Sequence, residues 1–175
     1  MPCGNASEHT AKPGPTIRQT TDGKNLHLFH RYGDIKLISK DGTILMADSK
    51  RLSDLSWEMG EEVGKAYSND MEINMDRWSS TAISCFLDLI NVETPRDPIA
   101  DLPVLFELAT LYYNYGDDGE IVTLIQDSIA KTATLKGRQW SLLKFANDFP
   151  DGSDLVLGKL ALRSMSRKAF LSLRS

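Results

Sequence analysis

The sequence predicts an α/β (α+β) domain in which helices dominate and a small three-stranded sheet begins with an N-terminal β-hairpin. Three observations lead to this prediction: a turn signal at Asp41-Gly42, an alternating segment at 71–75, and a long run of helical apolar spacing after it. A sheet of three strands cannot cover both of its own faces, so helical hairpins must pack against it.

The hairpin is predicted from two short apolar runs, residues 35–38 and 43–46, which lie on either side of Asp41-Gly42. Asp-Gly favours a two-residue turn, because both positions of that turn require a positive φ. Apolar spacing then predicts a helix from 49 to about 63, and the alternation over 71–75 predicts the third strand.

Capping residues and apolar periodicity mark the later helices. Asp76 is expected to cap a helix whose apolar residues recur every four positions: Trp78, Ala82, Phe86 and Ile90. Asp101 is expected to cap the next helix, and Gly116 to end it. Asp117 and Glu120 have the spacing of a capping box, which predicts the start of another helix.

The 175 residues are enough for one domain with a segment on either side of it. Residues 1–25 are polar and contain proline and glycine, which predicts a flexible leader. Residues 26–133 would form the domain. Residues 134–175 would form a helical extension, with helices at about 138–147 and 154–167.

Composition and the first residues bear on the cellular compartment. The N-terminal stretch has neither the basic nor the apolar region of a secretory signal peptide, and no run of the sequence has the length of a membrane span. Two cysteines, Cys3 and Cys85, are few for an oxidising compartment. We therefore expect a cytoplasmic or nuclear location and no membrane partner.

The charge of the chain disfavours nucleic-acid binding. The formal net charge is -4 and the pI is about 5.4, whereas nucleic-acid binders carry a basic field. The local alternative is a group of basic residues near the C-terminus: Arg163, Arg167, Lys168 and Arg174. We interpret this group as solvated helix surface and expect no nucleic-acid partner.

Side chains with catalytic or metal-binding chemistry are sparse. His27 and His30 are three residues apart and could form a metal or enzyme centre with Asp34, although two histidines at this spacing also occur as ordinary polar surface. Cys85 lies in an apolar helical pattern, which favours a buried thiol over a nucleophile. Because no nucleotide-binding, hydrolase or metalloprotease motif is present, we expect no enzyme activity, catalytic residue, metal or cofactor.

The order of these elements, with several short motifs inside them, resembles the BTB/POZ family, especially the divergent BTB domains of fungi. The first two strands are matched by 33–38 (GDIKLI) and 42–46 (GTILM), and the first conserved helix by 49–56 (SKRLSDLS). The helices that follow are matched by 75–76 (MD), 82–90 (AISCFLDLI) and 102–115 (LPVLFELATLYYNY). The resemblance implies a BTB/POZ-like fold from about residue 33 to residue 130.

The chain departs from the family pattern in three places. Asp48 stands where a histidine usually precedes the first conserved helix, and the aromatic position after the conserved serine is altered around Trp57. The family's Ala-Asp-Lys-Tyr signature is reduced to Ala109, Tyr112 and Tyr115. These departures bear on the choice of partner more than on the fold.

The resemblance implies a protein–protein interaction module. Family members form homodimers or other oligomers, and some dock a cullin scaffold as substrate adaptors of ubiquitin ligases. Met59-Gly60-Glu61 matches the short apolar-x-Glu pattern with which some members dock a cullin. The leader does not resemble the family's dimerisation segment, so we expect a monomer or an atypical dimer.

The predicted partner-binding residues combine one acid with large apolar or aromatic side chains, which dominate the energy of most interfaces. They are Trp57, Met59, Glu61, Tyr67, Tyr112 and Tyr115. Each apolar member of this set could equally belong to the core. The partner would be a protein, either a second copy of the chain or a cullin scaffold.

Overall fold

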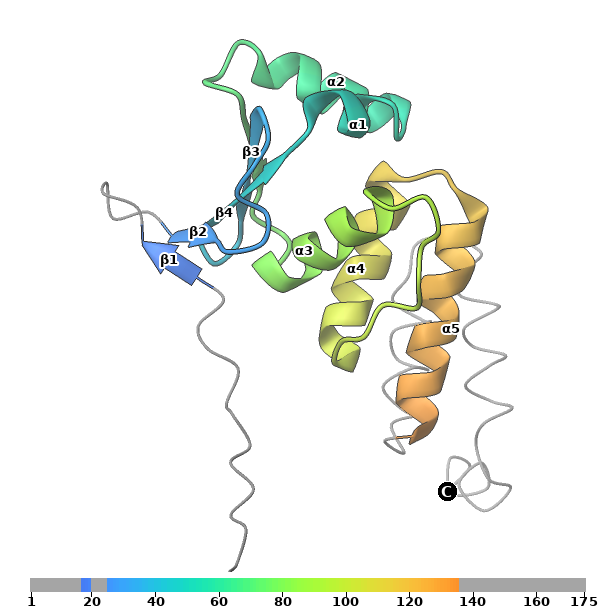
Figure 1. The fold of residues 1–175 in the computed structure, drawn as a ribbon. Helices are drawn as coiled ribbons and strands as arrows, with labels where there is room; N and C mark the ends of the chain where they lie inside the picture. Colours follow the sequence, from blue (N-terminus) through green and yellow to red (C-terminus); the bar gives the residue numbers. More distant parts are fainter. Residues whose placement is uncertain (1–16, 20–24, 136–175) are drawn as a thin grey trace, which may run out of the picture.

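The computed structural model of the chain describes residues 17–19 and 25–135 (Figure 1). The fold is mixed α/β, as the sequence predicted, and helices contribute more residues than strands. Its elements are β1 (Ile17–Gln19), β2 (Asn25–His27), β3 (Ile35–Ser39), β4 (Thr43–Ala47), α1 (Ser49–Ser53), α2 (Trp57–Ala66), β5 (Glu72–Met75), α3 (Ser80–Ile90), α4 (Leu102–Tyr115) and α5 (Gly119–Leu135). The helices predicted near 138–147 and 154–167 lie outside the described residues.

The sheet has five strands in the order β1-β2-β4-β3-β5, where the sequence predicted three. The three predicted strands are β3, β4 and β5; β3 and β4 are antiparallel, and β5 joins β3 in parallel. The two additional strands fall in 17–27, mostly within the predicted leader. Strands of three residues are too short to show a two-residue periodicity, so the sequence pattern did not reveal them.

The helices form two groups around the sheet (Figure 1). The short helices α1 and α2 pack on each other, and α2 also contacts β5 and α4. The longer helices form a series in which α3 packs on α4 and α4 on α5, while α3 contacts β4. Among the described helices, none combines the length and apolar character that crossing a lipid bilayer requires.

The core lies where β3, β4 and β5 meet the helices. Its large side chains, with less than 2% of their surface exposed, include Leu37, Leu45, Phe86 and Tyr112. The rings of Phe86 and Tyr112 pack edge to face with centroids 6.1 Å apart. Gly33, just before β3, passes close to the end of β4: its φ is +153°, and an added Cβ would lie 2.2 Å from the carbonyl oxygen of Ala47.

The β3–β4 turn differs from the predicted two-residue turn. Gly42 alone in this turn has a positive φ, +72°, and its N–H donates to the Ser39 carbonyl at 2.9 Å. The Ser39 hydroxyl donates to the Thr43 carbonyl at 2.9 Å and accepts from the Thr43 N–H at 3.0 Å. The loop is therefore a three-residue one, 40–42, with glycine at its left-handed position.

Two aspartates, one at each end of β3, join the strand to the starts of two helices. Asp34 precedes β3 and accepts from the N–H and the hydroxyl of Ser49, the first residue of α1, at 2.8 and 2.5 Å. Asp41 follows β3 and accepts from the N–H and the hydroxyl of Ser80, the first residue of α3, at 2.9 and 2.7 Å. We refer to these as the Asp34–Ser49 pair and the Asp41–Ser80 pair.

The two pairs hold both carboxylates in the charged form. Burial opposes ionisation of Asp41, but the hydrogen bonds donated by the hydroxyl and the N–H of Ser80 outweigh it, and the pKa of Asp41 is lowered to about 2. The hydroxyl and then the N–H of Ser49 lower the pKa of Asp34. Carboxylates at a helix start also favour the positive end of the helix dipole.

Several helix starts differ from those predicted. The helix expected over 49–63 is two helices, because Ser56 interrupts it and caps α2 by accepting from the Met59 N–H at 3.2 Å. Ser79, not Asp76, caps α3, because Asp76 lies a full turn before the helix begins. Asp118, not Asp117, accepts from the N–H of Glu120 at the start of α5, at 2.8 Å.

Candidate functional site

The outer face of α2 carries two large exposed aromatic side chains. Trp57 is the first residue of the helix and is 72% exposed, and Tyr67 follows its last turn and is 65% exposed. Their positions along the helix differ by about 15 Å at 1.5 Å per residue. Glu61 lies one turn after Trp57 and is also exposed.

The local sequence explains why α2 takes this orientation. Its apolar residues Met59, Val63 and Ala66 follow helical spacing and are buried against the core. The Ser56 hydroxyl donates to the carbonyl of Tyr115 at 2.8 Å, which ties the start of α2 to the end of α4. The opposite face of the helix is therefore directed outward, together with its aromatic residues.

The remaining predicted partner-binding residues are not on this surface. Met59 and Tyr112 have no exposed surface, so neither can contact a partner in this conformation. Tyr115 is half-buried, and its ring packs edge to face on Trp78 with centroids 5.6 Å apart. Of the six predicted residues, the structure leaves Trp57, Glu61 and Tyr67 on the surface and places the other three in or against the core.

The burial of Met59 also bears on the cullin-docking pattern at 59–61. That pattern needs its apolar residue to face a partner, whereas Met59 packs inside with Val63. Only the glutamate of the pattern, Glu61, is fully on the surface. The geometry of α2 therefore gives no support to cullin docking through this motif.

The two histidines near the N-terminal end of the domain form a stacked pair. His30 donates its backbone N–H to Nδ1 of His27 at 3.3 Å, and the ring centroids are 5.2 Å apart. The carbonyl of His30 accepts from the N–H of Met46, which fixes the pair beside β4. Burial lowers the pKa of His27, and it lowers the pKa of His30 against the opposing charge of Asp88.

The structure does not bring Asp34 to this histidine pair. Asp34 is bonded to Ser49, whereas His30 faces α3, with Nε2 3.0 Å from the Ser84 hydroxyl and 3.3 Å from Asp88. Within the part of the chain that the structure describes, no group of three or more His, Cys, Asp or Glu is arranged to hold a metal ion. The predicted alternative centred on His27, His30 and Asp34 therefore gains no support from the geometry.

Ser84, His30 and Asp88 have the residue types of a hydrolase triad but not its arrangement. In a triad the histidine joins serine and acid through its two different ring nitrogens. Here both the hydroxyl and the carboxylate contact the same nitrogen, Nε2. The contact is a polar link between the β2–β3 segment and α3.

Cys85, which the sequence predicted to be buried, is half-buried against the core. Burial raises the pKa of its thiol, which keeps it protonated at neutral pH. The basic residues considered for nucleic-acid binding, Arg163, Arg167, Lys168 and Arg174, lie outside the described residues.

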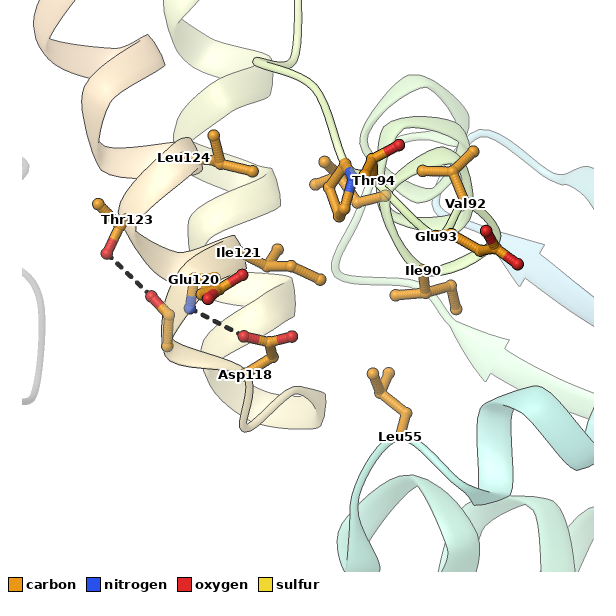
Figure 2. A pocket seen from close by; sticks show the side chains of 13 residues that line it. Leu55, Ile90, Val92, Glu93, Thr94, Asp118, Glu120, Ile121, Thr123 and Leu124 are labelled. Carbon is orange, nitrogen blue, oxygen red and sulfur yellow. Dashed lines mark hydrogen bonds between the residues drawn. The ribbon is translucent and has the colours of Figure 1, made fainter.

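A groove that the sequence did not predict lies between α5 and the end of α3. It encloses about 660 Å³, and side chains from three separate segments form it. Figure 2 shows Leu55 from the α1–α2 connection, Ile90 from α3 and Ile121 from α5 around a common space. Three acids, Glu93, Asp118 and Glu120, line the same groove. We refer to it as the α3–α5 groove.

No signal in the sequence singles out the α3–α5 groove. Its apolar residues follow the same spacing as core residues, and only the tertiary arrangement leaves them around a hollow. A second hollow, of about 600 Å³, adjoins it at Leu55 and reaches Trp57 and Glu61. The groove and the aromatic face of α2 are therefore neighbours on the molecule.

Comparison with known proteins adds no family to these observations. No protein-family model matches the chain, and no curated protein is significantly similar to it. The resemblance to BTB/POZ domains thus rests on the residues of this chain.

Proposed function

We propose that this chain is a protein–protein interaction module of the BTB/POZ-like kind, and that it binds its partner through the outer face of α2. The observation that carries the proposal is the pair of exposed aromatic residues at the two ends of α2, Trp57 and Tyr67. Exposed tryptophan and tyrosine are costly in water and are the residues most often found at the energetic centre of interfaces.

The arrangement of the elements also supports the BTB/POZ-like proposal. A hairpin, two short helices, a strand parallel to the first hairpin strand and a series of longer helices follow one another in the expected order. Asp34 and Gly33, the residues of the first motif, have structural roles in this arrangement. Both observations concern the fold of the module, whereas the exposed aromatic pair concerns its function.

The partner is either a second copy of the chain or a different protein, and solution mass distinguishes the two. Light scattering of the full chain over a hundredfold concentration range would show a mass that rises to a dimer in the first case. In the second case the mass stays at that of one chain, and the partner is captured on immobilised protein and identified by mass spectrometry.

The decisive variant carries Trp57→Ala and Tyr67→Ala. Truncation of a central aromatic residue costs about 2 kcal/mol or more, so we expect the dimer, or the captured partner, to bind at least about thirtyfold more weakly. Because both side chains are largely exposed, the free energy of unfolding should change by less than about 1 kcal/mol.

A matched control removes two aromatic residues that are equally exposed but lie elsewhere. Phe29→Ala with Tyr32→Ala truncates two side chains that are each 77% exposed, on the β2–β3 segment. The proposal requires binding to persist in this control. Binding that survives in the α2 variant, or is lost equally in both variants, would contradict it.

A further inference from the structure

The α3–α5 groove has an apolar floor and an acidic lining. The partly exposed side chains of Leu55, Ile90 and Leu124 contribute the apolar surface (Figure 2). Every charged residue that lines the groove within 25–135 is an acid: Glu93, Asp118 and Glu120. A ligand for such a groove must combine apolar side chains with positive charge.

The adjoining hollow continues this charge. It is lined by Asp54, Glu61 and Asp117, and among the residues that the structure describes no lysine or arginine lines either hollow. Asp54 is paired with Lys50 on α1 at 2.7 Å, so the field of the groove comes mainly from the other acids. The two hollows form one acidic region that spans the end of α3, the start of α5 and the start of α2.

The complementary charge is found in the same chain. Residues 136–175 contain eight Lys or Arg and three Asp or Glu, a net charge of +5, while residues 1–135 carry a net charge of -9. Within 154–168, Lys159, Arg163 and Arg167 recur every four residues among leucine, valine and methionine. Residues 1–16 offer no such complement, because Glu8 and Lys12 are their only charged side chains.

The chain is long enough to bring this segment to the groove. Helix α5 has 17 residues, so its end at Leu135 lies about 25 Å from the groove at its start. The eighteen residues 136–153 connect Leu135 to the basic segment. Even as a continuous helix, eighteen residues would cover about 27 Å, which is enough to return along α5.

We propose that residues 154–168 dock in the α3–α5 groove of the same chain. Apolar side chains of the segment cover Leu55, Ile90 and Leu124, and its basic side chains face the acids of the groove. The inference does not depend on the proposed binding function of α2, since it concerns a contact within one chain that can be measured without a partner.

The experiment is hydrogen–deuterium exchange of the full chain, followed at the amides of 154–168. The test variant is Glu93→Lys with Glu120→Lys, two exposed acids that line the groove. Reversal of two charges should weaken docking by about tenfold, so these amides should exchange about tenfold faster.

A matched control reverses two acids outside the groove. Glu58→Lys with Asp76→Lys makes the same change in net charge, and Glu58 lies in the first turn of α2 as Glu120 does in α5. We expect exchange of 154–168 in this control to equal that of the unmodified chain. Unchanged exchange at β3 and β4 in both variants would show that the fold is intact.

The reciprocal variant reverses the basic segment. Arg163→Glu with Arg167→Glu should also release the segment, and exchange of the amides of 119–124 should rise. Combined with Glu93→Lys and Glu120→Lys, it should restore protection, because the charges are again complementary.

Three results would overturn the proposal. The first is equal exchange of 154–168 in the groove variant and in the control. The second is a combined variant in which the amides of 154–168 lose the sum of the protection lost in the groove variant and in the reciprocal variant, instead of recovering it. The third is protection that disappears on dilution, because this would place the segment in the groove of a second copy.

Discussion

The two ends of β3 carry the same polar contact and differ in what that contact holds. At each end an aspartate accepts from the N–H and the hydroxyl of a serine that begins a helix. The Asp34–Ser49 pair anchors α1, which has five residues. The Asp41–Ser80 pair anchors α3, whose Phe86 and Ile83 lie in the centre of the core.

The carboxylates also differ in their surroundings. Asp41 accepts a further hydrogen bond from the Thr43 hydroxyl at 3.2 Å, and its pKa is lowered to about 2. Asp34 lies at the surface and is bonded to Ser49 alone among the described side chains. The difference predicts that the stability gained from a helix-start contact depends on the helix that the contact anchors as well as on the hydrogen bonds themselves.

Removal of the Asp41 carboxylate should have the largest effect. Asp41→Ala leaves the Ser80 N–H and two hydroxyl groups without their acceptor at the start of a core helix. We expect the free energy of unfolding to fall by about 2 kcal/mol, measured by urea denaturation at pH 7. Asp76→Ala, at an exposed aspartate, is the control and should change it by less than about 0.5 kcal/mol.

Acid should weaken the Asp41–Ser80 pair in a defined pH range. The folded pKa of Asp41 is about 2, below its ordinary value of 3.8, so its contribution is complete above 3.8 and is lost as the pH falls toward 2. The partly exposed carboxylate is screened by solvent, which limits the contribution to about 1 kcal/mol. The stability difference between the unmodified chain and Asp41→Asn should shrink by that amount between pH 6 and 2, and a constant difference would refute this.

Removal of the Asp34 carboxylate should have a smaller effect than removal of Asp41. Asp34 is itself exposed, and its contacts hold a helix of only five residues. We expect Asp34→Ala to lower the free energy of unfolding by less than about 1 kcal/mol in the same urea experiment. A loss as large as that of Asp41→Ala would break the comparison, since it would make α1 as important to stability as α3.

The smallest effect is the difference between the two coupling energies. Double-mutant cycles of Asp41 with Ser80, and of Asp34 with Ser49, isolate each pair from the rest of the protein. We expect the first coupling to exceed the second by about 0.5 kcal/mol. If the two coupling energies are equal, the hydrogen bonds of the two pairs contribute equally to stability. The different stabilities of Asp41→Ala and Asp34→Ala would then come only from the helices that the pairs anchor.

The sequence predicted the mixed fold and the central strands because their signals are local. Alternating apolar residues and Asp41-Gly42 identified β3, β4 and β5 within a residue or two. It missed β1 and β2, since backbone pairing with distant residues defines these strands. Two helix caps were predicted at the wrong residues, Asp76 and Asp117. The observed caps, Ser79 and Asp118, lie close by in the sequence and have side chains that cap a helix equally well, so the sequence alone could not separate them.

The candidate site was predicted less well than the fold, for a physical reason. Trp57, Met59 and Tyr67 are all apolar residues of one segment, and the sequence could not tell which of them face inward. The break of the predicted helix at Ser56 sets the rotation of α2, and therefore decides that Met59 is buried and Trp57 exposed. The α3–α5 groove depends on three segments that meet only in the folded chain.

The position of β5 at the edge of the described sheet has a consequence for aggregation. A free edge can accept a strand from another molecule and begin a fibril, most readily when it is long and apolar. This edge is four residues long, and Glu72 and Asn74 alternate with the two buried apolar positions. Lys36 binds Glu72 at 2.9 Å and adds a second charge beside that edge. An incoming strand would have to desolvate these polar groups for few backbone hydrogen bonds, so this edge is a poor template for another strand.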